Sequence, residues 1–219
     1  MSFGDDHFEK ILPSYLVDAE KARLKQALSQ FTVDERGNEI NYSNFYRDYN
    51  HAYFMQSDLI KEIRIGNWNE EKGEFQKAYT DAIIISNTCD ISFENKRDVN
   101  TKQCLFAPLL DFNEYLADLE IAGYSKDKIN SFSQNVKAQL RTNIFYLPIH
   151  FKEGKEYIVL IDNVFWFPTS ELNSYISDIE DNRITSFTHF GFYLFILKLS
   201  YHLCRLPEQC DREIEMVLN

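Results

Sequence analysis

The stretch over residues 82–91 most constrains the fold of this chain. It opens with Ala-Ile-Ile-Ile, and such an apolar run is typical of a strand that is buried on both faces. The run ends abruptly in Ser-Asn-Thr-Cys-Asp over residues 86–90. We therefore expect a core strand that carries a cluster of small polar and reactive side chains at its C-terminal end. Such a rigid support can hold a functional site, although the same residue types also favour turns.

The cluster contains candidate catalytic and binding residues. Cys89 and Asp90, together with His150, would supply a thiol, a carboxylate and a base if the histidine reached the same rim. Asn87 and Thr88 are candidate binding residues beside them. Nothing in the spacing of these residues shows that His150 reaches the rim. Cysteine, moreover, is most often a small buried hydrophobic residue. A thiol enzyme built on Cys89 is therefore an alternative hypothesis.

Composition and charge limit the possible functions. The 219 residues include 44% hydrophobic and 15% aromatic side chains, enough for a sizeable core in one domain with extensions. The net charge of −11 is spread evenly along the chain, so no whole domain is predicted to bind nucleic acid. The first residues lack the pattern of a signal peptide, which predicts a cytoplasmic location. The four cysteines are then expected to be free thiols.

Many short strands are predicted between two helical ends. A helix is expected over residues 8–31, and an aromatic segment over 40–54 is expected to pack in a core or an interface rather than stack on bases. A loop is expected at 66–73, and Pro108 indicates an edge strand or a strand end. Two helices are expected at 111–122 and 125–141. The predicted strands cover 58–65, 82–87, 103–110, 144–148, 157–161 and 163–167.

A long helix is predicted over residues 187–205, capped by Ser186. It is apolar on nearly all sides, apart from a narrow polar seam through Lys198 and His202. Its uninterrupted apolar run, 190–197, is far shorter than the ~20 residues that a bilayer requires, so no membrane span is expected. Because the helix has more apolar surface than one contact covers, we expect it to bind a protein partner or a second copy of the chain.

Several short segments resemble the PemK/MazF-like toxin family. Residues 56–60, Gln-Ser-Asp-Leu-Ile, are similar to the opening of that family, and residues 82–86 resemble its Pro-Ala-Leu-Val-Ile-Ser strand. Residues 106–109 and the segments 160–162 and 169–172 resemble its later strands and the start of its terminal helix. The resemblance implies an SH3-like barrel, often dimeric, that in active members cleaves single-stranded RNA without a metal.

The chain departs from this family at both of its catalytic positions. Active members place an arginine directly before the central strand, where this chain has Asp81. A carboxylate there would repel a phosphodiester rather than stabilise its transition state. The family's Thr-Ser pair after the next strand corresponds here to Leu109, Leu110 and Asp111. The departures predict that ribonuclease activity by the family's mechanism is absent.

Two further groups of residues are candidate binding or metal sites. Lys126, Lys137 and Arg141 share one side of the second inserted helix, and with Lys96, Arg97 and Lys102 they form the local positive excess of the chain. These side chains are expected either to form a solvated helix face or to bind phosphate or an acidic partner. The candidate binding residues are Arg97, Lys126, Lys137 and Arg141. The group His202, Cys204 and Cys210 lacks the usual zinc-ligand spacing, so no metal and no cofactor are predicted.

The sequence as a whole predicts an α+β chain with a small SH3-like, mostly-β barrel. We expect an N-terminal extension over 1–53, a barrel over 54–172 with a helical insertion at 111–141, and a C-terminal helical segment over 173–219. The favoured function is that of a non-catalytic interaction or regulatory component of a bacterial toxin- or phage-defence-type system. The alternatives are a metal-independent endoribonuclease with relocated catalytic residues, which would bind RNA, and a thiol enzyme using Cys89.

Overall fold

The computed structural model describes residues 18–19, 21–22, 42–49, 51–92, 103–150 and 152–203. Most of the helix predicted over 8–31 lies outside the described residues, as do Lys96, Arg97, Lys102, Cys204 and Cys210. Of the two predicted extensions, the structure describes residues 18–19, 21–22, 42–49, 51–53 and 173–203.

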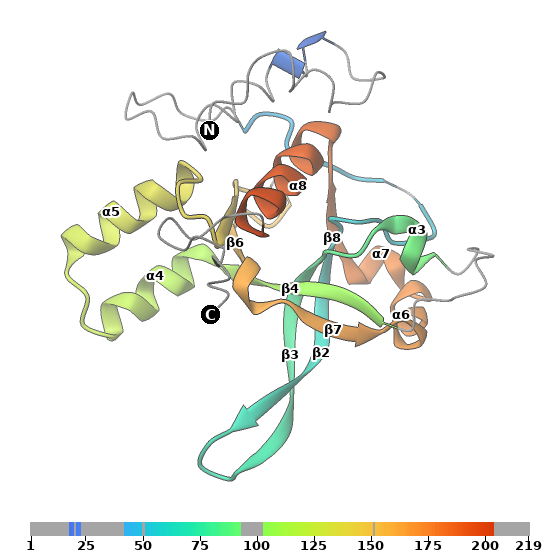
Figure 1. Cartoon of the computed structure of the whole chain (residues 1–219), viewed down its shortest axis with the longest axis horizontal. Helices are drawn as coiled ribbons and strands as arrows, with labels where there is room; N and C mark the ends of the chain where they lie inside the picture. The colour runs from blue at the N-terminus through green and yellow to red at the C-terminus, as the bar shows by residue number, and fades with distance from the viewer. Residues whose placement is uncertain are drawn as a thin grey trace, which may run out of the picture.

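One antiparallel sheet organises the described residues. Its strands follow the order β1-β8-β2-β3-β4-β6-β5, and β7 also pairs with β4. The sheet curls into a half-barrel with helices on several sides, so the chain is α+β (Figure 1). The strands are β1 Tyr46–Arg47, β2 Leu59–Asn69, β3 Glu74–Ile84, β4 Gln103–Asp111, β5 Ile144–Leu147, β6 Tyr157–Leu160, β7 Phe165–Pro168 and β8 Arg183–Phe187.

The helices follow much of the predicted order. The two inserted helices, α4 and α5, form where the sequence predicted them, and a side chain of Asp111 caps the first. Strands β1 and β8 belong to the sheet although both lie outside the barrel segment predicted over 54–172. The helical elements are α3 Thr88–Ile91, α4 Phe112–Ile121, α5 Lys126–Lys137, the 3₁₀ turn η1 Ile161–Asn163, α6 Thr169–Ile176, α7 Ile179–Asn182 and α8 His189–Leu203.

The central strand is buried on both faces, as its sequence predicted. Ile83 joins the core inside the curl of the sheet, whereas Ala82 and Ile84 join a second core under α6. All three are fully buried. Because neighbouring side chains of a strand point to opposite faces, one short apolar run contributes to two cores.

Helix α8 packs into the inner core. Leu194 and Phe195 are completely buried there, together with residues of six strands. The two edge strands meet beside them, since the hydroxyl of Tyr46 donates to the carbonyl of Pro148 just after β5, 2.7 Å away. The sheet itself thus covers much of the apolar surface of α8. The expected contact between this helix and a partner stays a prediction.

The start of α8 differs from the prediction. Ser186 was expected to cap the helix, but it belongs to β8, and its hydroxyl donates to Asp58 over 2.6 Å. The main chain instead turns at Thr188, whose carbonyl accepts from the N–H of Phe192. Lys198 was expected in an exposed polar seam, yet only 1% of it is exposed. The curl of the sheet encloses a side of the helix that periodicity alone leaves open.

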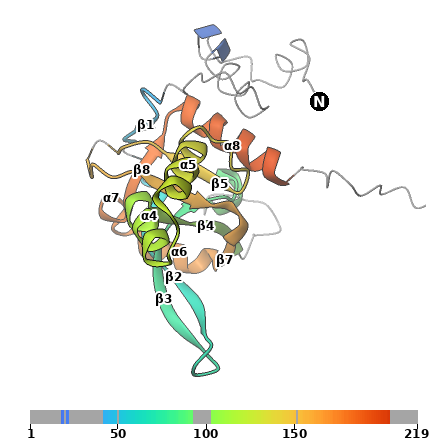
Figure 2. The same ribbon diagram turned by 90° about the vertical axis from the view of Figure 1, so that its left-hand side faces the viewer.

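A long hairpin projects from the body of the sheet (Figures 1 and 2). The loop predicted over 66–73 is too long. Strand β2 continues to Asn69 and β3 begins at Glu74, so the turn covers only residues 70–73. Strand β8 pairs with β2 only at Leu59 and Ile60, and β4 pairs with β3 only from Asp81 onward. Beyond these points the two strands pair with each other, and we call their residues 61–80 the arm.

A β-bulge sets the direction of the arm. The register between β2 and β3 shifts between Ile60 and Ile63, and Glu62 has a positive φ of 51°. The carboxylate of Asp81 accepts the N–H of Glu62 over 3.0 Å, which fixes the extra residue in place. Bulges bend and twist a strand, so this one directs the arm away from the body of the sheet.

Pro108 does not mark an edge strand. Strand β4 pairs with β3 on one side, and on the other it pairs with β7 through Phe106 and with β6 from Leu109 onward. Pro108 falls where the partner changes from β7 to β6. The missing N–H of proline therefore lies at a break in the ladder, where an interior strand tolerates it.

Candidate binding site at the base of the arm

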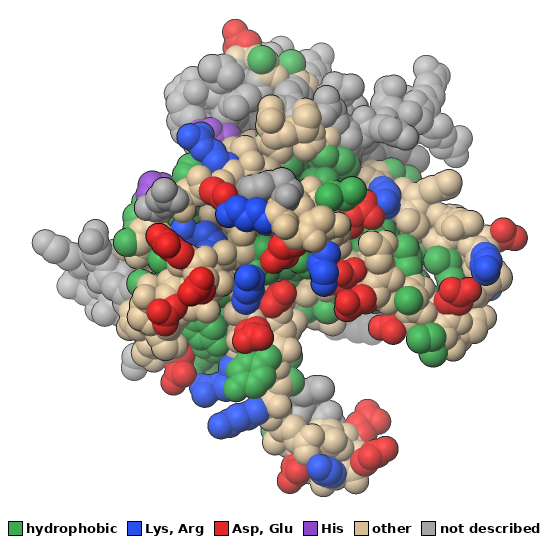
Figure 3. Space-filling view, turned by 180° about the vertical axis from the view of Figure 1, so that it is seen from behind, with side chains coloured by type: hydrophobic (Ala, Val, Ile, Leu, Met, Phe, Trp, Pro, Cys, Tyr) green, Lys and Arg blue, Asp and Glu red, His purple; other side chains and the backbone are tan. Residues whose placement is uncertain are grey.

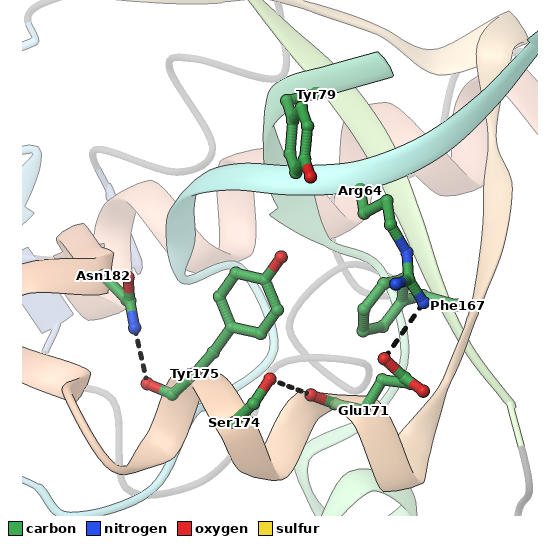
Figure 4. Close-up of a pocket in the computed structure, with 7 residues that line it drawn as sticks. All are labelled: Arg64, Tyr79, Phe167, Glu171, Ser174, Tyr175 and Asn182. Atoms are coloured by element: carbon green, nitrogen blue, oxygen red, sulfur yellow. Dashed lines mark hydrogen bonds and ion pairs between the residues drawn. The ribbon is translucent and has the colours of Figure 1, made fainter. Parts of the chain in front are cut away.

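A cleft of about 290 Å³ lies where the arm joins the body (Figure 4). Aromatic rings form much of its wall, and one cationic and one anionic side chain face each other within it. The lining residues are Arg64, Tyr79, Phe167, Glu171, Ser174, Tyr175 and Asn182.

Secondary structure explains why these residues converge. Arg64 and Tyr79 are directly paired across β2 and β3, and such partners project from the same face of an antiparallel pair. Glu171 and Tyr175 are four residues apart on α6, so they share one side of that helix. Phe167, near the end of β7, is 3% exposed and forms the floor of the cleft. The cleft is therefore built on regular elements rather than on loops.

An ion pair and a hydroxyl bond connect α6 to the arm. Nη2 of Arg64 lies 3.0 Å from Oε2 of Glu171, and about half of each side chain is exposed to solvent. The hydroxyl of Tyr175 donates to the carbonyl of Glu62 over 3.0 Å. Burial raises the pKa of Tyr175, while a hydrogen bond from the Arg64 backbone lowers it. The hydroxyl thus occupies part of the outer edge of β2.

Exposed aromatic side chains continue from the cleft along the arm. Phe75 is 74% exposed and Tyr79 is 64% exposed, although both lie in regular strand. Gly66, opposite Lys77, leaves room for Phe75, whose ring would lie 3.6 Å from a Cβ at that position. We call the surface formed by Arg64, Phe75, Lys77 and Tyr79 the arm face. Aromatic residues are common anchors of protein interfaces.

The rim predicted at residues 87–90 is shaped by local structure. The side chain of Asn87 accepts the N–H of Cys89 over 2.9 Å and caps the short helix α3. The hydroxyl of Thr88 accepts the N–H of Gln56, also over 2.9 Å. Cys89 is exposed. The two predicted binding residues therefore hold the chain reversal that follows the central strand.

His150 occupies a different part of the fold from Cys89. It lies between β5 and β6, where it is 1% exposed and its ring contacts that of Tyr46 at 5.1 Å. Burial lowers its pKa, and Glu153 and Asp48 oppose this effect. Cys89 and Asp90 lie in α3, which follows β3. The structure gives the histidine a position in the core beside β1.

The predicted basic residues of α5 have acidic or aromatic neighbours. Lys137 makes two bonds to Glu156, of 2.7 and 2.9 Å, and Lys126 lies 3.9 Å from Glu120. The guanidinium of Arg141 lies 5.6 Å from the ring centre of Phe132. Helices α5 and α3 lie on opposite sides of the view in Figure 1. Figure 3 shows acidic and basic side chains interspersed over the opposite face of the molecule.

Asp81 and Asp111, which the sequence resemblance set against the catalytic positions of PemK/MazF-like toxins, have structural roles. Asp81 holds the bulge of Glu62, as described above. Asp111 accepts the N–H groups of Asn113 and Glu114 at the start of α4, over 2.9 and 3.2 Å. These carboxylates therefore stabilise a strand bend and a helix start.

The remaining cysteine and histidine candidates do not assemble a metal site in the described residues. Nε2 of His202 lies 2.9 Å from a carboxylate oxygen of Asp162, and no group of three metal-ligating side chains occurs in this part of the chain. Cys104 is buried and donates to the carbonyl of Phe167. Burial raises the pKa of Cys104 to about 11, which makes the thiol unreactive.

Sequence reasoning missed the cleft, because its residues come from five separate elements and because 66–73 was predicted to be a loop. The local signal was the alternation of Phe75, Lys77 and Tyr79, which is typical of a strand with one distinctive face. The pairing of Arg64 with Glu171, 107 positions apart, has no local signal.

The described helices are each too short or too polar to cross a bilayer. Comparison with protein-family models finds none that matches, and a search of the curated proteins finds no match either.

Proposed function

We propose that this chain is a non-catalytic protein-binding module that engages its partner through the arm face and the cleft at its base. The exposure of Phe75 and Tyr79 on a projecting hairpin carries this proposal. Large aromatic side chains that are exposed on one face, next to a cleft, have the composition of interface anchors.

The edges of the arm provide a second kind of contact. The pairings of β2 with β8 and of β3 with β4 are confined to the inner ends of these strands. Beyond Arg64, up to which the hydroxyl of Tyr175 occupies the edge of β2, the outer residues of the arm therefore offer backbone donors and acceptors that a partner strand can extend. Apolar anchors and backbone pairing together are the components of recognition by strand addition.

The roles of Asp81 and of the two candidate binding residues at the rim support a binding function over a catalytic one. Asp81 holds a bulge, and Asn87 and Thr88 hold the turn at α3. Each of these side chains has a structural task that explains its presence. A relocated ribonuclease site would require some of them to act on a phosphodiester instead.

The resemblance of residues 56–60 and 82–86 to PemK/MazF-like toxins supports the finer part of the proposal. In that interpretation the half-barrel is a divergent SH3-like barrel of this family, and the chain is a cytoplasmic interaction or regulatory component of a bacterial toxin- or phage-defence-type system. The binding role proposed for the arm does not depend on this assignment.

The proposal is tested by affinity capture with purified, immobilised protein and an extract of the source cells, quantified by mass spectrometry. Phe75→Ser should reduce the retained partner roughly tenfold or more, the usual cost of removing an aromatic anchor. Trp166→Ser is the matched control, because Trp166 is 60% exposed on β7 and lies outside the arm. Equal retention by the wild type and both variants would contradict the proposal.

A further inference from the structure

The cleft at the base of the arm has the composition of a site for an organic cation. Three aromatic rings, those of Tyr79, Phe167 and Tyr175, line the same cleft as the carboxylate of Glu171 (Figure 4). The rings of Phe167 and Tyr175 meet edge to face, with centres 6.0 Å apart. Aromatic faces attract cations through their quadrupole, and a carboxylate adds a charged hydrogen-bond acceptor.

The chain's own Arg64 already occupies this site. Its guanidinium projects into the cleft and meets Glu171 at 3.0 Å (Figure 4). The positive charge of Arg64 also acts on the pKa of Tyr175, in the direction that favours ionisation of the phenol. The arrangement shows that the cleft accommodates a guanidinium group. Since the side chains of Arg64 and Glu171 remain 42% and 47% exposed, the pair is accessible to a competitor and its mutual stabilisation is small.

The surroundings of the cleft favour a basic partner. Residues 169–182, which span α6 and α7, contain four acidic side chains and no lysine or arginine: Glu171, Asp178, Glu180 and Asp181. The chain as a whole carries a net charge of −11. A positively charged segment would therefore be attracted to this wall before any specific contact forms.

We propose that the cleft binds a guanidinium or ammonium side chain of a basic partner segment, which displaces Arg64 from Glu171. This inference rests on the proposed function and names the chemistry of the partner. Arg64 acts as an intramolecular competitor that occupies the cleft when no partner is bound. A competitor of this kind lowers the apparent affinity by the fraction of time that it blocks the site.

The test uses N-acetyl-arginine amide as the probe and its neutral isostere, N-acetyl-citrulline amide, as the ligand control. Binding is followed by NMR through the ring signals of isotopically labelled tyrosine. Arg64→Thr should bind the arginine probe roughly two- to fivefold more tightly than the wild type, because a competing cation held by a weak, exposed ion pair has been removed. The citrulline probe should not shift the signals of Tyr79 or Tyr175.

Two charge-removing variants locate the site within the Arg64→Thr background. Glu171→Gln should weaken binding of the arginine probe by roughly tenfold, the usual effect of losing a charge-assisted hydrogen bond. Glu180→Gln removes the same charge from an exposed position of α7 outside the cleft, and it should leave binding nearly unchanged. Circular dichroism of each variant checks that the fold is intact.

The inference is overturned if the Arg64→Thr protein does not bind the arginine probe, if citrulline binds equally well, or if Glu171→Gln and Glu180→Gln have equal effects. The proposed function fails separately. If capture of a cellular partner depends on Phe75 while the arginine probe does not bind, the arm is an interface and the cleft is not a cation site. If the probe binds while capture is independent of Phe75, the cleft is a cation site and the arm face is not the interface.

Discussion

Replacement of the buried Lys198 by methionine should change how the stability of the protein depends on pH. Lys198 is 1% exposed, and its ammonium group donates to the carbonyl of Gln139 over 2.5 Å, just beyond the end of α5. Burial lowers the pKa of Lys198 to about 7, from an ordinary value of 10.5. Lys198→Met keeps a flexible chain of similar length but cannot carry a charge.

The sign and size of the effect follow from proton linkage. The unfolded chain keeps Lys198 protonated up to about pH 10.5, whereas the folded chain releases this proton near pH 7. Between these values the unfolded state binds more protons, so the free energy of unfolding rises with pH. At 1.36 kcal/mol per pKa unit, the rise between pH 7 and pH 9 is about 2 kcal/mol. The hydrogen bond to Gln139 favours the charged form, so this figure is an upper value.

The assay is urea denaturation at pH 7, 8 and 9, followed by circular dichroism, with the wild type, Lys198→Met and the control Lys128→Met. Lys128 is exposed on α5, so its variant should follow the wild type. From pH 7 to pH 9, the unfolding free energy of the wild type should rise by about 2 kcal/mol relative to that of Lys198→Met. A difference that stays constant over this range would refute the assignment of Lys198 as a buried, neutral amine.

Three further substitutions test the fold and the rim. Asp58→Asn, measured by urea denaturation, should cost about 3–5 kcal/mol because it removes the carboxylate that lies 3.0 Å from the buried guanidinium of Arg183 and leaves this charge with backbone carbonyls alone. Gly191→Ala should lower the melting temperature, since its Cβ would lie 2.7 Å from the carbonyl oxygen of Phe45 and overpacking costs about 1–3 kcal/mol. Cys89→Ser should change the stability by less than about 0.5 kcal/mol, because Cys89 is exposed; a larger loss would show that its thiol is part of the packing.

The parts of the fold that could be predicted are those that depend on short patterns of apolar residues along the chain. The apolar run 82–85 was predicted to be buried on both faces because adjacent apolar residues in a strand must serve two faces, and residues 82–84 are buried in this way. The two inserted helices, predicted at 111–122 and 125–141, form over 112–121 and 126–137. These signals are local, so they can be recognised without knowledge of the tertiary structure.

The arm and the cleft could not be predicted, for two different physical reasons. Gly66 and Asn67 are typical of turns, but pairing of β2 with β3 along eleven residues each outweighs this preference. The cleft depends on the path of the chain from β2 to α6, which brings Arg64 to Glu171. The burial of Lys198 has the same origin, since only the curl of the sheet decides which sides of α8 are covered.

Hydrogen–deuterium exchange of the protein, free and bound to the partner captured on the wild-type bait, shows whether the arm and its cleft form the binding surface. If the arm and its cleft form the binding surface, partner binding should slow exchange at residues 61–69 and 74–80 and in α6, where backbone donors become paired or covered. The exchange of α3 and α8 should be unchanged. Slower exchange confined to α8, or to residues 87–91, with none in the arm, would contradict the account.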